Sequence, residues 1–450
     1  MRWAPRMAAA LMAAALAGCA GAPSSLSKQA LNRLIAMENY PSAEKHLEKG
    51  KQRQYGRKNM VLFYLDKGMV QHHAAKYKES GQSFDKAQSR MEELYTVSLS
   101  QAGGMILLND NIMDYAGEPF ERTLTNVFRA LNYVFLGRLD EALVESRKVE
   151  LFLDELNRKM GKKNSYKDDA FARYLDFLLY ADAGKTDDAR ISLEAAMQAY
   201  SWYASAYNTP TPRFDSPQED GRSGELVFIH YNGIIPRKVS KTFQVAWNQA
   251  VAIARSSPDT EAGDSRFKNA LAAGFLGHAV TVSYPEYVQD SFSIASSEVR
   301  IGSSAVSSTR LMEDISAIAS KSLAERMAGA VTRSIARATV KYVIAESAAR
   351  AADKSCAQRY GKEAWQTTLC RQTARAFAHG TAAATEIADT RGWSSLPAQI
   401  RMARLEISPG RHDVEVHFKS ASGQLISTRI FKDVEITQSK RTYLAYRTAQ

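Results

Sequence analysis

The chain has 450 residues, of which 45% are hydrophobic and 24% are charged, and its formal net charge is +11. This composition is typical of a folded protein with two or three domains, and it excludes an intrinsically disordered chain. The basic residues are interspersed with acidic ones, which favours a solubilising surface; the same charge also suits anionic lipid, peptidoglycan or an acidic partner.

The N-terminus has the pattern of a lipoprotein signal peptide over residues 1–18. Arg2 and Arg6 precede an apolar run, residues 7–17, that is too short to span a bilayer. Leu-Ala-Gly then stands directly before Cys19, which resembles a bacterial lipobox. The alternative interpretation is an ordinary secretory cleavage site beside a chance cysteine.

The lipobox resemblance implies cleavage before Cys19 and acylation of its thiol and its amino group, and two or more acyl chains hold a protein stably on a membrane. Ala20 follows, rather than an aspartate of the kind linked to inner-membrane retention, so the implied location is the periplasmic face of the outer membrane. Loss of residues 1–18 removes two arginines and no acid, which lowers the net charge from +11 to +9. We expect membrane attachment and no nucleic-acid partner.

Residues 19–26 are predicted to form a lipidated tether, and residues 27–202 a domain of tetratricopeptide-type helical hairpins. The pattern is clearest in FRALNYVFLGRLDEALVESRKV, residues 128–149, and three further segments align at the same offsets. Small side chains on paired helices allow the two backbones to approach closely. The residues predicted to mediate this repeat packing are Gly68, Ser80, Ala130, Tyr133, Gly137, Ala142, Gly184 and Ala189.

Four such hairpins are enough for a short superhelix whose concave face can bind an extended peptide or a helix of a partner. An insertion over residues 103–119 separates the second hairpin from the third. It either plugs the gap between them or forms a candidate partner loop, because long loops in helical stacks are often functional. The candidate loop residues are Met105, Ile106, Leu107, Leu108 and Tyr115.

Residues 203–224 contain several Pro and Gly residues and are predicted to be a linker, followed by a mixed α/β region over residues 225–390. Strands are expected at 225–231 and 279–284, and a hairpin turning about Ser296 and Ser297. A long Ala-rich helix over 311–354 has a basic side; it either packs against protein, which its alanines favour, or lies on a membrane.

Cys356 and Cys370 are the only other cysteines, and an oxidising compartment makes a disulfide between them plausible. On one straight helix they would be about 21 Å apart. The bond therefore requires a turn near Gly361.

Residues 391–450 alternate apolar and polar side chains in four predicted strands and are expected to form a small C-terminal antiparallel β domain. The predicted fold class is therefore α+β. Asp413, Glu415 and His417 fall on one strand face and His412 on the other. This set could bind zinc, but a polar face is the favoured interpretation, and we expect no metal site.

Four features together resemble a family of bacterial outer-membrane lipoproteins that have tetratricopeptide-like repeats and no assigned catalysis. They are the lipobox, ALNYVFLGRLDEALVESRK (130–148), LVFIHYNGIIPRKV (226–239) and ADTRGWSSLPAQIRMARLEISPG (388–410). The resemblance implies a periplasmic protein of the cell envelope, and the family is loosely grouped with cell-envelope proteins that include small lipoproteins that activate peptidoglycan synthases. It does not cover the segment between the two C-terminal cysteines.

No glycine-rich phosphate loop, HExxH, GxSxG or CxxC motif occurs in the sequence. We therefore expect no catalytic residue, no cofactor, no small-molecule substrate and no enzymatic activity. The favoured function is an adaptor that binds an envelope protein through the helical repeats. The alternative is a structural or cell-wall-binding lipoprotein whose C-terminal strands contact glycan through Tyr443 and Tyr446; a periplasmic hydrolase is the weakest hypothesis.

Overall fold

The chain folds as an α+β protein in which N-terminal helices precede a strand-rich second half. The structure is a computed structural model, and it describes residues 23–100, 113–160, 166–213, 222–256, 279–302, 305–384 and 388–449. No helix in these ranges is both long enough and apolar enough to span a membrane.

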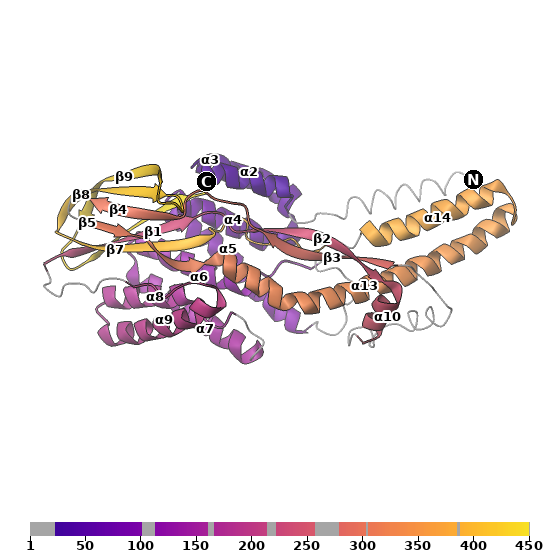
Figure 1. The fold of residues 1–450 in the computed structure, drawn as a ribbon, viewed down its shortest axis with the longest axis horizontal. Coiled ribbons are helices and arrows are strands. Elements are labelled where there is room, and N and C mark those ends of the chain that lie inside the picture. Colours follow the sequence, from indigo (N-terminus) through magenta and orange to yellow (C-terminus); the bar gives the residue numbers. More distant parts are fainter. Residues whose placement is uncertain are drawn as a thin grey trace.

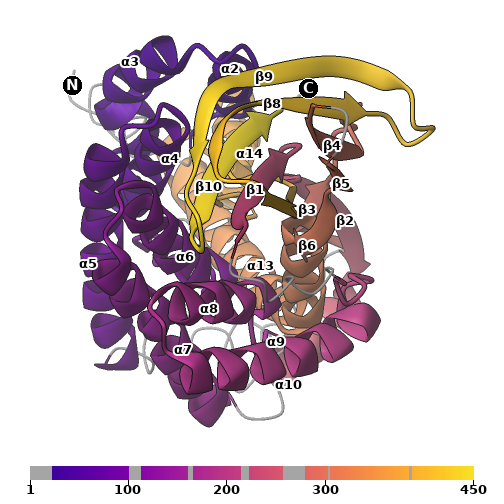
Figure 2. The ribbon, with the colours of Figure 1, turned by 90° about the vertical axis from the view of Figure 1, so that its left-hand side faces the viewer.

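The helices of the first half follow one another in antiparallel pairs, and each packs against the next along the chain. In Figure 2 they trace an arc, and the strands lie on its inner side. The elements are α2 (Ser25–Ala36), α3 (Tyr40–Gly50), the π-helix η1 (Lys51–Tyr55), the 3-10 helix η2 (Arg57–Asn59), α4 (Met60–His73), α5 (Tyr77–Ser100), α6 (Pro119–Phe135), α7 (Leu139–Met160), α8 (Ala170–Asp182) and α9 (Thr186–Ala206).

Four hairpins in this half share one turn geometry. In each turn a residue with positive φ lies five positions before the small residue of the second helix; the pairs are Glu38 and Ala43, Ala75 and Ser80, Gly137 and Ala142, and Gly184 and Ala189. The next N–H returns to the carbonyl five residues earlier, as from Arg138 to Tyr133 at 2.8 Å. This is a Schellman turn, in which glycine adopts the required left-handed conformation without steric cost.

Two four-stranded sheets form the second half. The first has the order β10-β1-β7-β6 and the second β5-β4-β8-β9. Only the pairing of β1 with β10 is parallel. The strands are β1 (Gly224–Asn232), β4 (Ser296–Ile301), β5 (Ala305–Ser308), β6 (Arg310–Asp314), β7 (Gln399–Ile407), β8 (Gly410–Lys419), β9 (Leu425–Ile436) and β10 (Arg441–Thr448).

The body therefore has three layers, with the first sheet between the helices and the second sheet. Val227, Ile229 and Tyr231 of β1 belong to a core shared with the helices. Leu226 and Phe228, on the opposite face of the same strand, belong to a core shared with the second sheet. A strand that is apolar on both faces is typical of such a central position.

The predicted boundaries in this half need three corrections. Residues 391–450 are not a separate domain, because β7 and β10 both pair with β1 in one sheet. Strand β1 is apolar on both faces, so it needs other strands and helices around it. Ser296 and Ser297 begin β4 rather than forming a turn; the chain turns after it, at Gly302 with φ +56°. The predicted linker begins too early, since α9 continues to Ala206 and Tyr203 is fully buried.

A long arm projects from the body (Figure 1). Its elements are the two-stranded ribbon β2 (Arg237–Ala246) and β3 (Ala279–Val288), α10 (Trp247–Ser256), the part of α13 (Ile315–Tyr360) beyond Arg326, and α14 (Trp365–Ala384). The start of α13 packs in the core that the helices share with the first sheet. Further along, Ile335 and Val340 of α13 belong to a separate core with α10 and the ribbon. Most of the predicted Ala-rich helix is thus a packed structural element.

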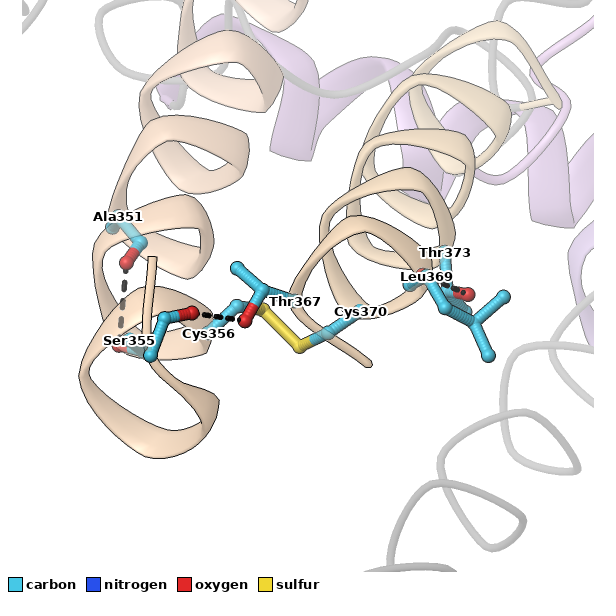
Figure 3. The surroundings of a disulfide bond; sticks show 8 residues. Ala351, Ser355, Cys356, Thr367, Leu369, Cys370 and Thr373 are labelled. Atoms are coloured by element: carbon cyan, nitrogen blue, oxygen red, sulfur yellow. Dashed lines mark hydrogen bonds between the residues drawn. A yellow bond between two sulfur atoms is a disulfide. The ribbon is translucent and has the colours of Figure 1, made fainter. Parts of the chain in front are cut away.

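Helix α14 packs back against α13 at the far end of the arm. The chain turns at Gly361, whose φ of +84° is a glycine conformation. This turn brings Cys356 and Cys370 to a Cα separation of 5.9 Å, and a disulfide joins them (Figure 3).

Candidate functional site

The predicted repeat-packing residues fall into two groups in the structure. Ser80 Oγ donates a hydrogen bond to the Gly68 carbonyl at 2.7 Å, and a Cβ on Gly68 would lie 2.6 Å from the Phe84 ring. Close backbone approach therefore requires glycine at this position. The predicted small residues Ala130, Ala142 and Ala189 of the other hairpins are also buried.

The remaining three residues of that set act differently. Gly137 and Gly184 lie in turns where an added Cβ would meet no atom within 4 Å, so their role is the positive φ rather than close packing. Tyr133 is only partly buried, and the guanidinium of Arg138 lies 5.1 Å from its ring centroid.

The predicted lipidation site and most of the predicted partner loop, Cys19 and residues 105–108, lie outside the described residues. Tyr115 is described, and its assignment as a partner-binding residue is wrong. Its side chain is buried, its hydroxyl donates to Glu121 Oε2 at 2.6 Å, and its N–H donates to the Lys58 carbonyl at 2.8 Å. A buried hydroxyl held by a carboxylate is a core contact.

The inner face of the helical arc is covered by the protein's own chain. Residues 388–398, here called the docked segment, run across it, and Trp393 is only 1% exposed. The Trp393 ring lies 5.7 Å from the ring of Phe84 on α5 and 6.0 Å from that of Phe128 on α6. The concave surface that the adaptor hypothesis assigned to a partner is thus filled in cis.

Two buried carboxylates of the helical half hold the docked segment. Asp66 on α4 accepts hydrogen bonds from the Ser395 N–H at 3.1 Å, from Ser395 Oγ at 2.7 Å and from Tyr55 Oη at 2.7 Å. Glu121 on α6 accepts the Trp393 N–H at 2.7 Å. Burial raises the pKa of both carboxyls. Sequence reasoning missed these residues, although acids among apolar neighbours, as in LFYLD, signal such a buried role.

A chain of buried hydrogen bonds links the first sheet to the hairpins. Tyr231 Oη donates to His72 Nε2 at 3.0 Å, and His72 Nδ1 donates to Asn132 Oδ1 at 2.7 Å. Asn132 Nδ2 then donates to Ser80 Oγ at 2.9 Å. Burial lowers the pKa of His72 to about 4, so the ring is neutral and can accept from Tyr231. This histidine is a structural connector.

Charged residues at the root of the arm fix it to the body. Glu118, directly before α6, accepts from Lys238 of β2 at 3.1 Å and from Arg326 of α13 at 2.6 Å. The Tyr287 ring of β3 lies 5.4 Å from the Lys238 ammonium. Burial alone would raise the pKa of Glu118, but the two cations outweigh it and hold the value at about 2. We call these four residues the root cluster.

The residues proposed for metal or glycan contact are engaged within the protein. His417 Nε2 lies 2.6 Å from Glu415 Oε1, and no three His, Cys, Asp or Glu side chains within the described ranges could share a metal ion. Tyr443 Oη donates to Asp182 at 2.6 Å, and Tyr446 Oη donates to Glu38. Both side chains are partly buried, and their contact with glycan stays a prediction of the alternative hypothesis.

The distinctive features of the described residues are a self-covered helical arc and a braced, projecting arm. In comparisons with known proteins, no family model, no curated protein and no solved structure matches the chain.

Proposed function

We propose that the chain is a non-catalytic scaffold of the bacterial cell envelope, held at the periplasmic face of the outer membrane by lipid on Cys19. Its helical half is a tetratricopeptide-like superhelix, an assignment supported by the four equivalent Schellman turns and the small residue five positions after each. The docked segment covers the inner face of the superhelix. We therefore assign the superhelix the role of supporting the sheets rather than of binding a partner.

The contact with an envelope partner is made by the tip of the arm, and the observation that carries this is the exposure of its large side chains. Tyr360, Trp365 and Leu369 are 45%, 70% and 55% exposed at the turn between α13 and α14. Aromatic residues dominate the binding energy of protein interfaces, and clustered exposed apolar side chains mark interaction sites. The disulfide beside them holds the two helix ends together.

The described chain begins far from this tip. Pro23 lines a small cavity together with Val239 and Tyr287, so the described chain begins at the root of the arm. Cys19 precedes Pro23 by four residues in the sequence. From Arg326 to Tyr360 the α13 helix extends about 50 Å. The first described residue and the contact tip therefore lie at opposite ends of the arm.

Replacing Cys19 by alanine is expected to release the protein from the membrane fraction, because the acyl chains supply its attachment. The measurement is fractionation of cells combined with labelling by a palmitate analogue. Globomycin, which blocks lipoprotein signal cleavage, should cause the wild-type precursor to accumulate. Unchanged processing with globomycin, or an alanine variant that stays in the membrane fraction, would exclude the lipid anchor.

A photo-crosslinking amino acid at position 365 is expected to give one discrete protein adduct in intact cells. The matched control is position 151 on α7, where Leu151 is 67% exposed on the helical body. The tip hypothesis requires the adduct at 365 and its absence at 151. Equal adducts at both positions, or none at 365, would rule out the tip as the contact surface while leaving the Cys19 result unaffected.

A further inference from the structure

A cavity of about 400 Å³ lies where the first two hairpins meet the edge of the first sheet. Tyr40 and His73 line it from the hairpins, Phe135 from the end of α6, and Arg447 from the edge strand β10. Its volume is within the range of sites that bind small molecules. We call it the edge cavity.

Arg447 is a charged group of the edge cavity for which no counter-ion is found among the described residues. It is 5% exposed, and its Nε and Nη1 atoms have no hydrogen-bond partner, while Nη2 donates to the Leu396 carbonyl at 3.3 Å. No ion pair among the described residues includes it. A buried guanidinium without a counter-ion lowers stability, so its presence calls for a compensating role.

The remaining charges near the cavity do not neutralise Arg447. Glu38 and Arg429 lie at the mouth, half exposed, with 3.9 Å between their charged atoms. Glu38 also accepts a hydrogen bond from the Tyr446 hydroxyl and forms no ion pair with Arg447. The interior therefore holds one uncompensated positive charge.

The walls around this charge are aromatic. The His73 ring lies 6.3 Å from that of Tyr40 and 5.4 Å from that of Tyr231, and Tyr77 stacks on Phe135 at 4.8 Å. His73 Nε2 is a second buried polar atom without a partner. Burial and then the charge of Arg447 hold the pKa of His73 well below its usual value. A neutral imidazole can donate or accept one further hydrogen bond there.

We infer that the edge cavity binds a small organic monoanion, a carboxylate carried on an aromatic or aliphatic body, with the carboxylate on Arg447. One guanidinium matches the single charge of a carboxylate, and charge-assisted hydrogen bonds of this kind are strong. The aromatic walls match the apolar body of the ligand.

The test is isothermal titration of the purified full chain with phenylacetate and octanoate. Saturable binding of at least one of them is expected, and phenylacetamide, which has the shape of phenylacetate without its charge, should bind at least about tenfold more weakly. Failure of both carboxylates to bind overturns the inference. Inorganic phosphate that binds as tightly as the carboxylates overturns it too, since the apolar body would then contribute nothing.

Arg447→Met tests whether the guanidinium serves binding or the fold. The variant should bind at least about tenfold more weakly, while its melting temperature without ligand stays equal to or above that of the wild type. The matched control, Arg429→Met at the cavity mouth, should change the affinity by less than about threefold. Retained affinity in Arg447→Met, or a lower melting temperature with unchanged binding, would identify Arg447 as a structural residue.

Discussion

Replacing Trp393 by alanine is expected to lower the free energy of unfolding by about 3–5 kcal/mol, as is typical when a large aromatic side chain is removed from a core. The Trp393 ring belongs to the docked segment and is buried against Phe84 and Phe128 of the helical hairpins. Its loss leaves a cavity at the contact between the two halves of the chain. Denaturant unfolding followed by circular dichroism measures the change.

The matched control is Trp365→Ala at the tip of the arm, where the side chain is 70% exposed. A substitution on the surface should change stability by less than about 0.5 kcal/mol. A Trp393→Ala variant as stable as this control would show that the docked segment does not pack on the helical arc. Partner crosslinking at an inner-face position such as 84 would then become the next experiment.

Replacing Glu118 by glutamine is expected to cost about 3 kcal/mol at pH 7, because it leaves the buried Lys238 and the Arg326 guanidinium without their counter-ion. The pKa of Glu118 is held at about 2, below its usual 4.5. A group whose pKa is lowered by folding stabilises the fold fully above its unfolded value and loses this contribution as the pH falls. The difference between wild type and variant should therefore shrink between pH 4.5 and pH 2.

Unfolding curves of both proteins at pH 7, 4 and 3 measure this effect. The matched control is Glu194→Gln, which breaks an exposed pair with Arg190 on α9 and should cost no more than about 0.5 kcal/mol at any of these values. A stability difference for Glu118→Gln that is constant with pH would contradict the assigned charge state of the root cluster.

The local parts of the fold could be read from the sequence. The hairpins that contain Gly137 and Gly184 depend on a glycine between amphipathic helices, and such signals lie within about ten residues of one another. The same holds for the small residues Ala142 and Ala189, because each lies at a fixed spacing after its turn. The lipobox is likewise a contiguous pattern, and it remains a prediction.

The rest of the fold and the residues of the candidate site depend on contacts between segments that are far apart in the sequence, and no local pattern encodes such contacts. Strand β1 pairs with β10, which follows it by more than 200 residues, so the predicted C-terminal domain does not exist as a separate sheet. The disulfide was compatible with the sequence, but the turn at Gly361 that permits it is a matter of chain path.

The sequence by itself determined the α+β class and the helical hairpins, because periodicity and turn chemistry act between near neighbours. Only the tertiary structure decided that Trp393 fills the inner face of the helices, that Glu118 braces the arm and that Arg447 is buried without a counter-ion among the described residues. Segments far apart in the chain exclude water from one another only when the chain is folded. Whether a charge or an apolar surface on one segment stabilises the fold therefore depends on the segment that packs against it.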